Sequence, residues 1–327
     1  MENYKTKLTI AIPTYNRLPK LKQTLASVLE ITKGKSVEVL VSDNCSTDGT
    51  WEYLQTVPQD RIRIFHNEKN LGADRNFLNC FEKATGEYVM LLGDDDLLLE
   101  KGLCSILEAI EKRPVFIHTN TSGLIERENG ELKPDRPRMK ENGLLIYQDK
   151  NKFLQDVGVY ITFVSSLVFR TEYVREIQDK EKYIDSYFLQ SHVALRTMEH
   201  EGCYILDTVN CCAASGNVAV AYDLYYVWGK CFGDLLYKTA IQSGFDEIAV
   251  DQIAHRAYAN TIRGFVWSFR KTCDNTNAWN QAMLWSYVKR YPELKRSFSW
   301  AVGCPRWLIP VAKRLDKMIL KLTKIIA

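Results

Sequence analysis

Short strand-like runs alternate with helical patterns along the first 118 residues, and no other feature of the sequence restricts the fold as strongly. The strand-like runs fall at residues 8–12, 37–41, 61–65, 88–92 and 115–118. Segments with helical spacing of apolar residues separate them, at residues 18–31, 50–54, 72–84 and 100–112. This rhythm predicts an α/β fold of Rossmann-like type, with a mainly parallel central sheet covered by helices.

The pattern changes further along the chain. Residues 126–143 are rich in charge, Pro and Gly and predict a surface excursion or flap. Strand-like segments return at 161–169 and 203–207, with a helix at 186–200 between them. From residue 222 onward the pattern is helical and aromatic. We therefore expect a catalytic or binding domain over residues 1–215 and a helical C-terminal region over residues 216–327.

Composition excludes several classes of protein. The chain has 327 residues, of which 25% are charged, and a net charge of +3, too small to indicate nucleic acid as a partner. Nine cysteines without a C-x-x-C pair argue against a disulfide framework or a zinc site and favour a reducing, cytoplasmic location. The N-terminus does not resemble a signal peptide, and no apolar run approaches the roughly 20 residues of a membrane span.

Three consecutive carboxylates, Asp94, Asp95 and Asp96, follow the apolar run at 88–92. Ligands of parallel sheets collect at the carboxyl ends of the strands. Adjacent carboxylates repel one another unless a cation neutralises them, and hard oxygen ligands favour Mg²⁺ or Mn²⁺. The segment therefore predicts a divalent-cation site, with a solvated acidic turn before the helix at 100–112 as the alternative.

Two further loops that follow strands carry groups suited to a nucleotide. Tyr15 offers an aromatic face for a base, and Arg17 offers a cation for phosphate. At the end of the next strand-like run stand Asp43, a hydrogen-bond acceptor for a uracil ring or a sugar hydroxyl, and Asn44. Ser46, Thr47 and Asp48 are residues typical of helix caps, and we expect them to act as caps.

Four segments in this order and spacing resemble the family 2 glycosyltransferases, whose catalytic domain has the A-type fold. They are residues 9–17 (TIAIPTYNR), 39–50 (VLVSDNCSTDGT), 70–76 (NLGADRN) and 86–96 (GEYVMLLGDDD). The resemblance extends over roughly residues 7–210. The variant Gly-Asp-Asp-Asp, with Asp-Arg-Asn upstream, most resembles transferases that build bacterial capsule, O-antigen and other surface polysaccharides.

The resemblance implies roles for matching positions. Pro13 and Tyr15 would pack on the nucleoside, Asp43 would contact the base, and Arg75 would lie near the nucleotide. Asp94 and Asp95 would match the diphosphate–metal motif, with Asp95 as the direct ligand. Gly93 stands where the first Asp of the usual Asp-x-Asp pattern is common, and Asp96 is the residue that could compensate.

Inverting members of this family use a carboxylate base on a later loop before a helix, and Asp185 is the best match. The usual Glu-Asp pair reads Ile184-Asp185 here. The alternative is that Asp185 only caps the helix that begins near Ser186.

Together these matches imply transfer of a sugar from a nucleotide-diphosphate donor, first of all a UDP-sugar, to a hydroxyl of a glycan or lipid-linked acceptor. Transfer would be metal-assisted and inverting. A non-catalytic sugar-nucleotide-binding protein and a nucleotidyltransferase on a similar fold remain alternatives. A dehydrogenase is disfavoured because no G-x-G-x-x-G loop follows the first strand.

Residues 304–326 place apolar side chains on one helical face and Lys or Arg on the remainder, with Asp316 as the single acid. A basic amphipathic helix with a tryptophan near its start is typical of a membrane interface. We expect an anionic surface, the inner face of the cell membrane, as its partner. Packing of the apolar face on the catalytic domain is the alternative.

Overall fold

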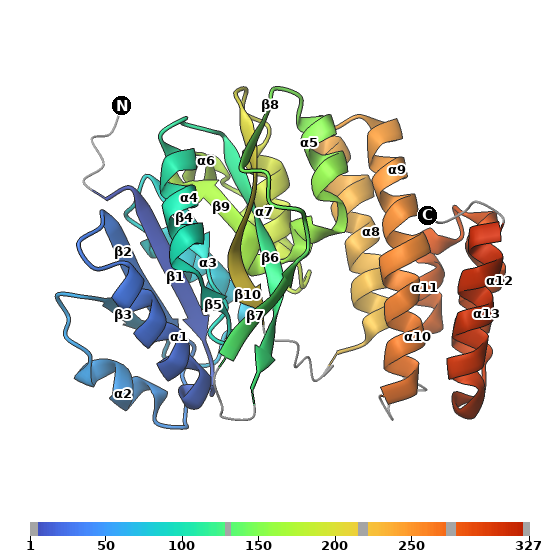
Figure 1. Ribbon diagram of the computed structural model, residues 1–327, viewed down its shortest axis with the longest axis horizontal. Helices are drawn as coiled ribbons and strands as arrows, with labels where there is room; N and C mark the ends of the chain where they lie inside the picture. The colour runs from blue at the N-terminus through green and yellow to red at the C-terminus, as the bar shows by residue number, and fades with distance from the viewer. Residues whose placement is uncertain (1–5, 128–131, 215–221, 273–278, 323–327) are drawn as a thin grey trace. The chain divides into compact units, whose positions relative to one another are not determined.

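The structure, a computed structural model, describes residues 6–127, 132–214, 222–272 and 279–322. The chain divides into two compact units, Met1–Val218 and Ala219–Ala327 (Figure 1). The first unit contains the sheet and the second is helical. Each unit is described separately below.

Among the described residues, the first unit has one mixed ten-stranded sheet in the order β3-β2-β1-β4-β9-β6-β10-β5. Beside this path, β7 pairs with β6 and β8 pairs with β10. The strands are β1 (Leu8–Thr14), β2 (Val37–Asp43), β3 (Arg63–His66), β4 (Tyr88–Leu91), β5 (Leu97–Leu98), β6 (Phe116–Glu126), β7 (Leu132–Pro137), β8 (Leu144–Tyr147), β9 (Leu167–Arg170) and β10 (Tyr204–Ala214).

The first four strands in space, β3, β2, β1 and β4, are parallel to one another, as the strand–helix rhythm predicts. β9 lies between β4 and β6 and is antiparallel to both. The chain reaches β9 from a short helix, α5 (Lys150–Val157), through two 3₁₀ turns, Gly158–Thr162 and Val164–Ser166. The strand expected at 161–169 is therefore wrong up to residue 166.

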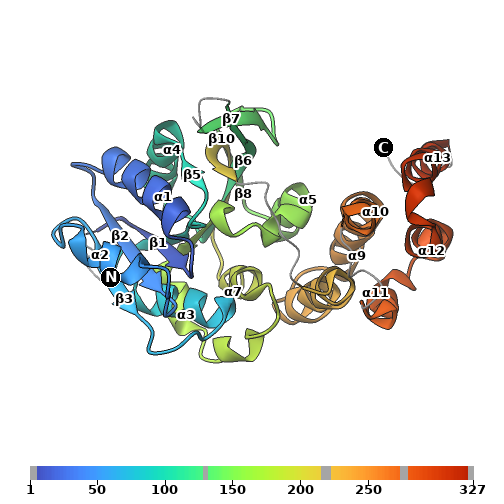
Figure 2. The same ribbon diagram turned by 90° about the horizontal axis from the view of Figure 1, so that it is seen from below.

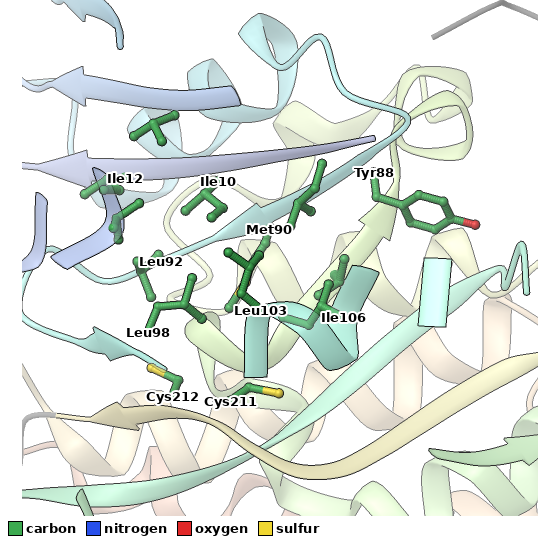
Figure 3. Close-up of a cluster of buried hydrophobic side chains, with 14 of the residues drawn as sticks. Ile10, Ile12, Tyr88, Met90, Leu92, Leu98, Leu103, Ile106, Cys211 and Cys212 are labelled. Carbon is green, nitrogen blue, oxygen red and sulfur yellow. The ribbon is translucent and has the colours of Figure 1, made fainter. Parts of the chain in front are cut away.

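One face of the sheet is covered by α1 (Leu18–Ile31) and α4 (Glu100–Ile110), and the other by α3 (Ala73–Lys83) and α7 (Leu189–Thr197) (Figure 2). Alternate residues of β1 and β4 point to the first face because side chains alternate along a strand. These residues and their helix partners form one buried apolar cluster (Figure 3). From β1, β4, α1 and α4 it contains Leu8, Ile10, Ile12, Tyr88, Met90, Leu92, Leu21, Leu25, Val28, Leu103 and Ile106.

Aromatic rings dominate the opposite face. The ring of Phe81 from α3 meets that of Phe169 from β9 edge to face at 4.9 Å, and Phe116 of β6 meets Phe169 at 5.3 Å. Edge-to-face pairs of this kind stabilise by about 0.5–1.5 kcal/mol beyond their burial. The remaining helices of the unit are α2 (Thr50–Thr56), α5 (Lys150–Val157) and α6 (Thr171–Glu176).

The segment expected to be a flap is partly regular. β7 pairs antiparallel with β6, so residues 132–137 of the expected surface excursion extend the sheet. Most of β7 is exposed, which explains why its sequence reads as polar surface. Residues 128–131, also within the expected flap, lie outside the described part of the chain.

The second unit is helical, as the pattern after residue 222 predicts. Its elements are a π-helical stretch (Tyr225–Cys231), α8 (Phe232–Asp234), a second π-helical stretch (Leu235–Ala240), α9 (Glu247–Arg256), a third (Ala257–Ile262), α10 (Arg263–Thr272), α11 (Gln281–Val288), α12 (Lys295–Gly303) and α13 (Ile309–Leu322). No helix within the described ranges is long and apolar enough to span a bilayer.

Candidate active site

The carboxyl ends of β1, β2 and β4 lie side by side because these strands are parallel neighbours. β1 ends at Thr14 opposite Asp43, the last residue of β2. β4 ends at Leu91, three residues before the acidic segment begins at Asp94. The three polar loops that the sequence placed after strands therefore meet at one edge of the sheet.

A guanidinium group links the loop after β1 to the acidic segment after β4. Nη1 of Arg17 donates to Oδ2 of Asp95 at 2.7 Å and to Oδ1 of Asp94 at 3.3 Å. The hydroxyl of Thr14 donates to the other oxygen of Asp94 at 2.7 Å. Burial raises the pKa of Asp94 to about 6, against the hydrogen bonds from Thr14 and Arg17. Asp95 is the more exposed of the two carboxylates.

Asp96 points to a different partner. Its carboxylate accepts from the hydroxyl of Ser165 at 2.5 Å, and the same hydroxyl accepts from the backbone N–H of Gly93 at 2.9 Å. A Cβ at Gly93 would lie 2.8 Å from Oδ2 of Asp96. The carboxylate of Asp96 therefore takes the space that a side chain at position 93 would need. This is the physical reason for a glycine there.

The donors at this edge fit a divalent cation in part. Within the described ranges, no group of three or more His, Cys, Asp and Glu side chains gathers closely enough to hold a metal ion. Mg²⁺ is nevertheless commonly bound by one or two carboxylates together with substrate phosphates. Asp95 and Asp94 supply two hard-oxygen donors on one side of Arg17. The pair suits an ion shared with a diphosphate better than an all-protein cage.

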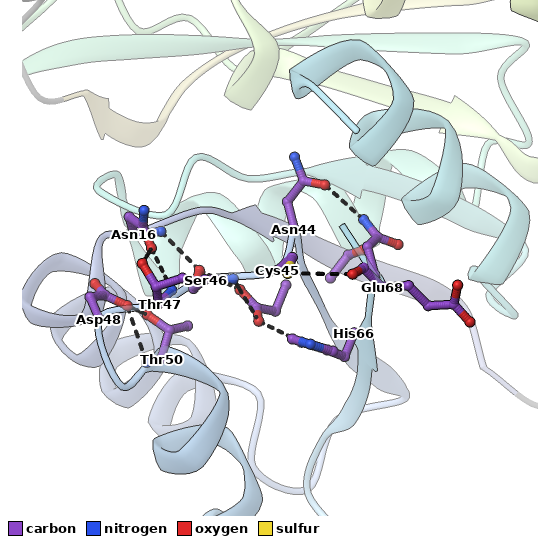
Figure 4. Close-up of polar contacts among 12 residues, drawn as sticks. Asn16, Asn44, Cys45, Ser46, Thr47, Asp48, Thr50, His66 and Glu68 are labelled. Atoms are coloured by element: carbon purple, nitrogen blue, oxygen red, sulfur yellow. Dashed lines mark hydrogen bonds and ion pairs between the residues drawn. The ribbon is translucent and has the colours of Figure 1, made fainter. Parts of the chain in front are cut away.

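Asp43 is fully buried and is bonded to Ser46 and His66, both labelled in Figure 4. Its Oδ1 accepts from the hydroxyl of Ser46 at 2.5 Å, and its Oδ2 lies 2.8 Å from Nδ1 of His66. The imidazole of His66 packs against the ring of Trp51, with 4.6 Å between centroids. A base approaching this edge would meet His66 and Ser46 before it met Asp43.

The loops after β1 and β2 are bound to each other (Figure 4). The backbone N–H of Asn16 donates to Ser46, and Oδ1 of Asn16 accepts from the backbone N–H of Thr47 at 2.7 Å. Asp48 accepts from the backbone N–H of Leu18 at 2.9 Å, so it satisfies the start of α1. It also accepts from the hydroxyl and the backbone N–H of Thr50, the first residue of α2. The N-cap of α2 is Gly49, which has no side-chain cap bond, so the caps expected at Ser46 and Thr47 are wrong and Asp48 supports the helix start from the residue before the cap.

Among the residues assigned to the nucleotide, Tyr15 and Arg17 are exposed, whereas Pro13 is buried within the last residues of β1. Asn44 is buried, and its amide is used inside the protein. Its Oδ1 accepts from Asn67 and the backbone N–H of Leu71, and its Nδ2 donates to Asn70. This arrangement makes Asn44 a support for the 67–72 loop.

Asp185 and Arg75 line one cleft of about 470 Å³. Its walls come from the start of α3, the 3₁₀ turns before β9 and the turn before α7. They are Leu71, Gly72, Ala73, Asp74, Arg75, Phe77, Thr162, Phe163, Val164, Ile184, Asp185, Tyr187 and Gln190. The Arg75 guanidinium donates to Glu181 at 2.6 Å. Val164 of this cleft is followed by Ser165, which donates to Asp96, so one wall of the cleft leads along the chain to the acidic segment.

The alternative role of Asp185, as a cap of the following helix, has no support in this geometry. α7 begins at Leu189, and Asp185 adopts a left-handed backbone with φ of 64°. Asp185 is exposed in the cleft.

Sequence reasoning missed four residues of the site: His66, Asp74, Ser165 and Gln190. His66 is the last residue of β3, which pairs with β2. Its position at a strand end is the sequence feature that could have indicated a place in the site. Asp74 lies inside the Asp-Arg-Asn segment that the resemblance used. Ser165 and Gln190 join the site only through tertiary contacts.

Residues 9–178 match the model of a protein family described as "Glycosyl transferase family 2". Relatives include the abequosyltransferase RfbV of Salmonella typhimurium, 27% identical over 213 residues that make up 61% of this chain and 63% of that protein. The GalNAc(5)-diNAcBac-PP-undecaprenol beta-1,3-glucosyltransferase of Campylobacter jejuni is 33% identical over 37% of this chain and 40% of that protein. The matches thus span less than two thirds of these relatives' lengths.

Solved structures share the fold over nearly the whole chain. S. aureus TarS in complex with UDP-GlcNAc has a TM-score of 0.63 at 18% identity, over 95% of this chain and 88% of that one. The mannosyltransferase PcManGT from Pyrobaculum calidifontis, in complex with GDP-Man and Mn²⁺, has a TM-score of 0.56 at 14% identity, over 97% and 88%. This likeness confirms the predicted fold class.

Proposed function

The chain belongs to glycosyl transferase family 2, and from this premise we propose that it transfers a sugar from a nucleotide-diphosphate donor to a hydroxyl of a glycan or lipid-linked acceptor, in the synthesis of a bacterial surface polysaccharide. We assign catalysis to the domain of residues 1–215 and a supporting role to residues 216–327. The Campylobacter relative, named for an undecaprenol-linked glycan, supports the acceptor class.

The observation that carries this proposal is the Arg17 guanidinium shared by Asp94 and Asp95 at the edge where β1, β2 and β4 end. A half-exposed guanidinium presents donors that match phosphate oxygens. Carboxylates beside it supply the hard oxygen ligands of a divalent cation. A diphosphate bound here would meet both groups.

We place the nucleoside beside Tyr15, His66 and Ser46, with Asp43 behind them. The TarS complexes with UDP-GlcNAc and UDP support UDP as the first choice of donor nucleotide. Asp43 would act by orienting Ser46 and His66, both of which it contacts. Tyr15, exposed on the loop that ends at Arg17, would supply the aromatic face.

Asp95, with Asp94, would hold Mn²⁺ or Mg²⁺ against the donor diphosphate. When bound, the cation supplies charge stabilisation to the departing nucleoside diphosphate. The complex of PcManGT with Mn²⁺ supports use of such an ion in this fold. We leave Asp96 out of the ligand set because its carboxylate is bonded to Ser165.

Asp185 is the proposed general base. It would accept the proton of the acceptor hydroxyl as that oxygen attacks the anomeric carbon and the bond from this carbon to the diphosphate breaks. A single displacement of this kind inverts the anomeric configuration. Exposure of Asp185 in the cleft that it lines with Arg75 supports this role, because a base must reach its substrate.

Turnover of a nucleotide sugar tests the function. We expect release of nucleoside diphosphate from at least one donor in a panel of UDP- and GDP-sugars, supplied with Mn²⁺ and lipid-linked glycan acceptors. Glycan product detected by mass spectrometry distinguishes transfer from hydrolysis. Tight donor binding without product from any acceptor would favour the non-catalytic binding protein instead.

The donor pocket makes a separate prediction. Asp43→Ala is expected to weaken UDP binding at least about tenfold, because Ser46 and His66 lose the buried carboxylate that holds them. Isothermal titration calorimetry measures this, with Glu68→Ala, an exposed acid on the neighbouring loop, as the matched control. Equal affinity of Asp43→Ala and the parent would place the nucleoside elsewhere.

We also propose that α13 contacts an anionic membrane surface. Trp307, before the helix, and four apolar residues of α13 are exposed: Val311, Leu315, Met318 and Leu322. At about 100° per residue the four residues of α13 lie within an arc of roughly 60°. Arg314, Lys317 and Lys321 are exposed beside this arc. An exposed apolar stripe flanked by cations suits the boundary between anionic headgroups and acyl chains.

The opposite face of α13 explains how the helix is held. Asp316 is buried and accepts from Arg263 at 2.6 Å, from Trp267 at 3.1 Å and from Ser297 at 2.7 Å. Ile309 and Leu320 are buried on the same side. α13 therefore packs on α10 and α12 through a face that excludes the exposed stripe. Ile325 and Ile326, which the sequence also assigned to the stripe, lie outside the described residues.

Vesicle binding tests this surface. Replacing Val311, Leu315 and Met318 together by Ser is expected to reduce sedimentation with anionic vesicles at least about tenfold, because burial of such a side chain stabilises by about 1.5–3 kcal/mol. Ile248→Ser, which changes an exposed apolar residue of α9, is the control. Point substitutions are preferable to truncation, since removing Asp316 would leave Arg263 buried and unpaired at a cost of about 3–5 kcal/mol. Indifference of the parent to such vesicles at low salt would refute the proposal.

A further inference from the structure

A second carboxylate lies directly under the turn that carries Asp185. Asp74, in the first turn of α3, is 8% exposed. Its Oδ2 accepts from the backbone N–H of Tyr187 at 3.2 Å. The backbone N–H groups of Asp185 and Ser186 lie near this carboxylate and lower its pKa, although the N–H of Ser186 donates to the carbonyl of Tyr183 at 3.2 Å. One buried side chain is thus bonded to a turn 113 residues away.

The turn that receives these bonds has an unfavourable backbone. Asp185 and Tyr187 both lie in the left-handed region, with φ of 64° and 63°. Residues other than glycine avoid this region because the Cβ approaches the backbone, and they remain there only where the surroundings hold them. Asp74 provides such a hold, because its buried carboxylate accepts from the N–H of Tyr187, one of the two left-handed residues.

The carboxylate of Asp74 also lies close to the proposed base, Asp185. The pKa of Asp74 is raised to about 6, mainly by burial and also by the nearby Asp185, against the opposing effect of the backbone N–H groups of 185–187. Burial makes the charged form of Asp74 unfavourable, whereas Glu82, the other acid of α3, is exposed to solvent. Asp74 and Asp185 line the same cleft.

We propose that Asp74 is a positioning residue, which holds the turn 185–187 so that the carboxylate of Asp185 points into the cleft. The inference rests on the proposed function, because it takes Asp185 as the base. Asp74 acts through the backbone of the turn and contributes to transfer only by way of Asp185. A misplacement of a reacting group by about 1 Å can lower a rate about 100-fold.

Amide hydrogen exchange tests the hold without any substrate. In Asp74→Ala we expect exchange at the amides of 185–187 to rise about tenfold or more, because the N–H of Tyr187 loses its acceptor and the turn loses the contact that holds it closed. Glu82→Ala, which removes an exposed acid from the same helix, should leave that exchange at the parent rate. Parent-like protection of 185–187 in Asp74→Ala would overturn the inference.

A double-mutant comparison tests the route of action. Asp74→Ala is expected to lower kcat about tenfold or more and to leave the Kd for UDP unchanged. In an Asp185→Asn background the same substitution should cause no further loss, because residues that act as a unit are not additive. An equal further loss in that background would show that Asp74 acts independently and would overturn the proposal.

Two additional results keep the outcomes distinct. If Asp74→Ala does not fold, Asp74→Asn decides, because it replaces one of the two acceptor oxygens by a donor. We expect an intermediate, about threefold change in exchange and in kcat, and parent values for both would contradict the proposal. Full activity of Asp185→Asn would refute the assignment of the base alone, since the exchange experiment measures the turn independently of catalysis.

Discussion

Asp185→Asn is expected to lower the turnover number at least about 100-fold while the affinity for UDP stays at the parent value. General-base catalysis typically contributes about 10²–10⁴-fold, and an amide cannot accept the proton that the acceptor hydroxyl loses. Asp185 lies in the cleft of α3 and α7, apart from the contacts of Asp43, Ser46 and His66. The substitution should therefore lower the turnover number without changing the affinity for UDP.

Steady-state kinetics and calorimetric titration with UDP measure the two effects on the same preparation. Asp60→Asn, which changes an exposed aspartate in the loop between α2 and β3, is the matched control and should keep parent turnover. The anomeric configuration of the product is a second readout, measured by NMR. A product that retains the configuration of the donor would exclude the single displacement for which Asp185 is proposed.

Asp95→Asn is expected to lose transfer activity by about two orders of magnitude or more while the protein stays folded. The loss follows from weaker binding of the cation beside the diphosphate, because an amide oxygen is a poorer ligand for Mn²⁺ or Mg²⁺ than a carboxylate. Arg17 donates to Asp95 and to Asp94 and keeps its second partner in the variant. The local structure should therefore survive.

The adjacent carboxylate supplies a control. Asp96→Asn changes a group bonded to Ser165, so we expect it to reduce activity less than tenfold and to leave the response to Mn²⁺ unchanged. Thermal shift with UDP and Mn²⁺ reports binding without turnover, since a ligand stabilises the folded state in proportion to ln(1 + [L]/Kd). Full activity of Asp95→Asn in excess chelator would contradict the proposed role of Asp95.

The fold class and much of the site could be predicted from the sequence because both depend on local order along the chain. Apolar periodicity separates buried strands from helices over a few residues, and α1 occupies the predicted 18–31. Since parallel strands bring their carboxyl ends to one edge, the loops after β1, β2 and β4 could be grouped before any contact was known. The meeting of Arg17 with Asp94 and Asp95 follows from this rule.

Only the tertiary structure decided which polar groups are paired and which are open. The sequence does not distinguish between Asp94, Asp95 and Asp96. In the structure, however, Ser165 from the turn before β9 donates a hydrogen bond to Asp96. Asp43 and Asn44 are both buried and bonded within the protein, because His66 and the 67–72 loop approach them from β3. Such pairings join residues far apart in sequence, and local patterns carry no information about them.

The same division holds for the C-terminal helix and for Asp185. An amphipathic pattern in α13 was readable, but the buried side contains Asp316 and the apolar stripe is exposed. Arg263 and Trp267 of α10 stabilise a buried carboxylate, and no periodicity of α13 could indicate partners on another helix. Likewise the sequence supplied Asp185 as a candidate base, whereas the left-handed turn and Asp74 beneath it arise from the packing of α3 against that turn. Local sequence determined the elements and the edge where chemistry is expected, and long-range packing determined the geometry of each charge.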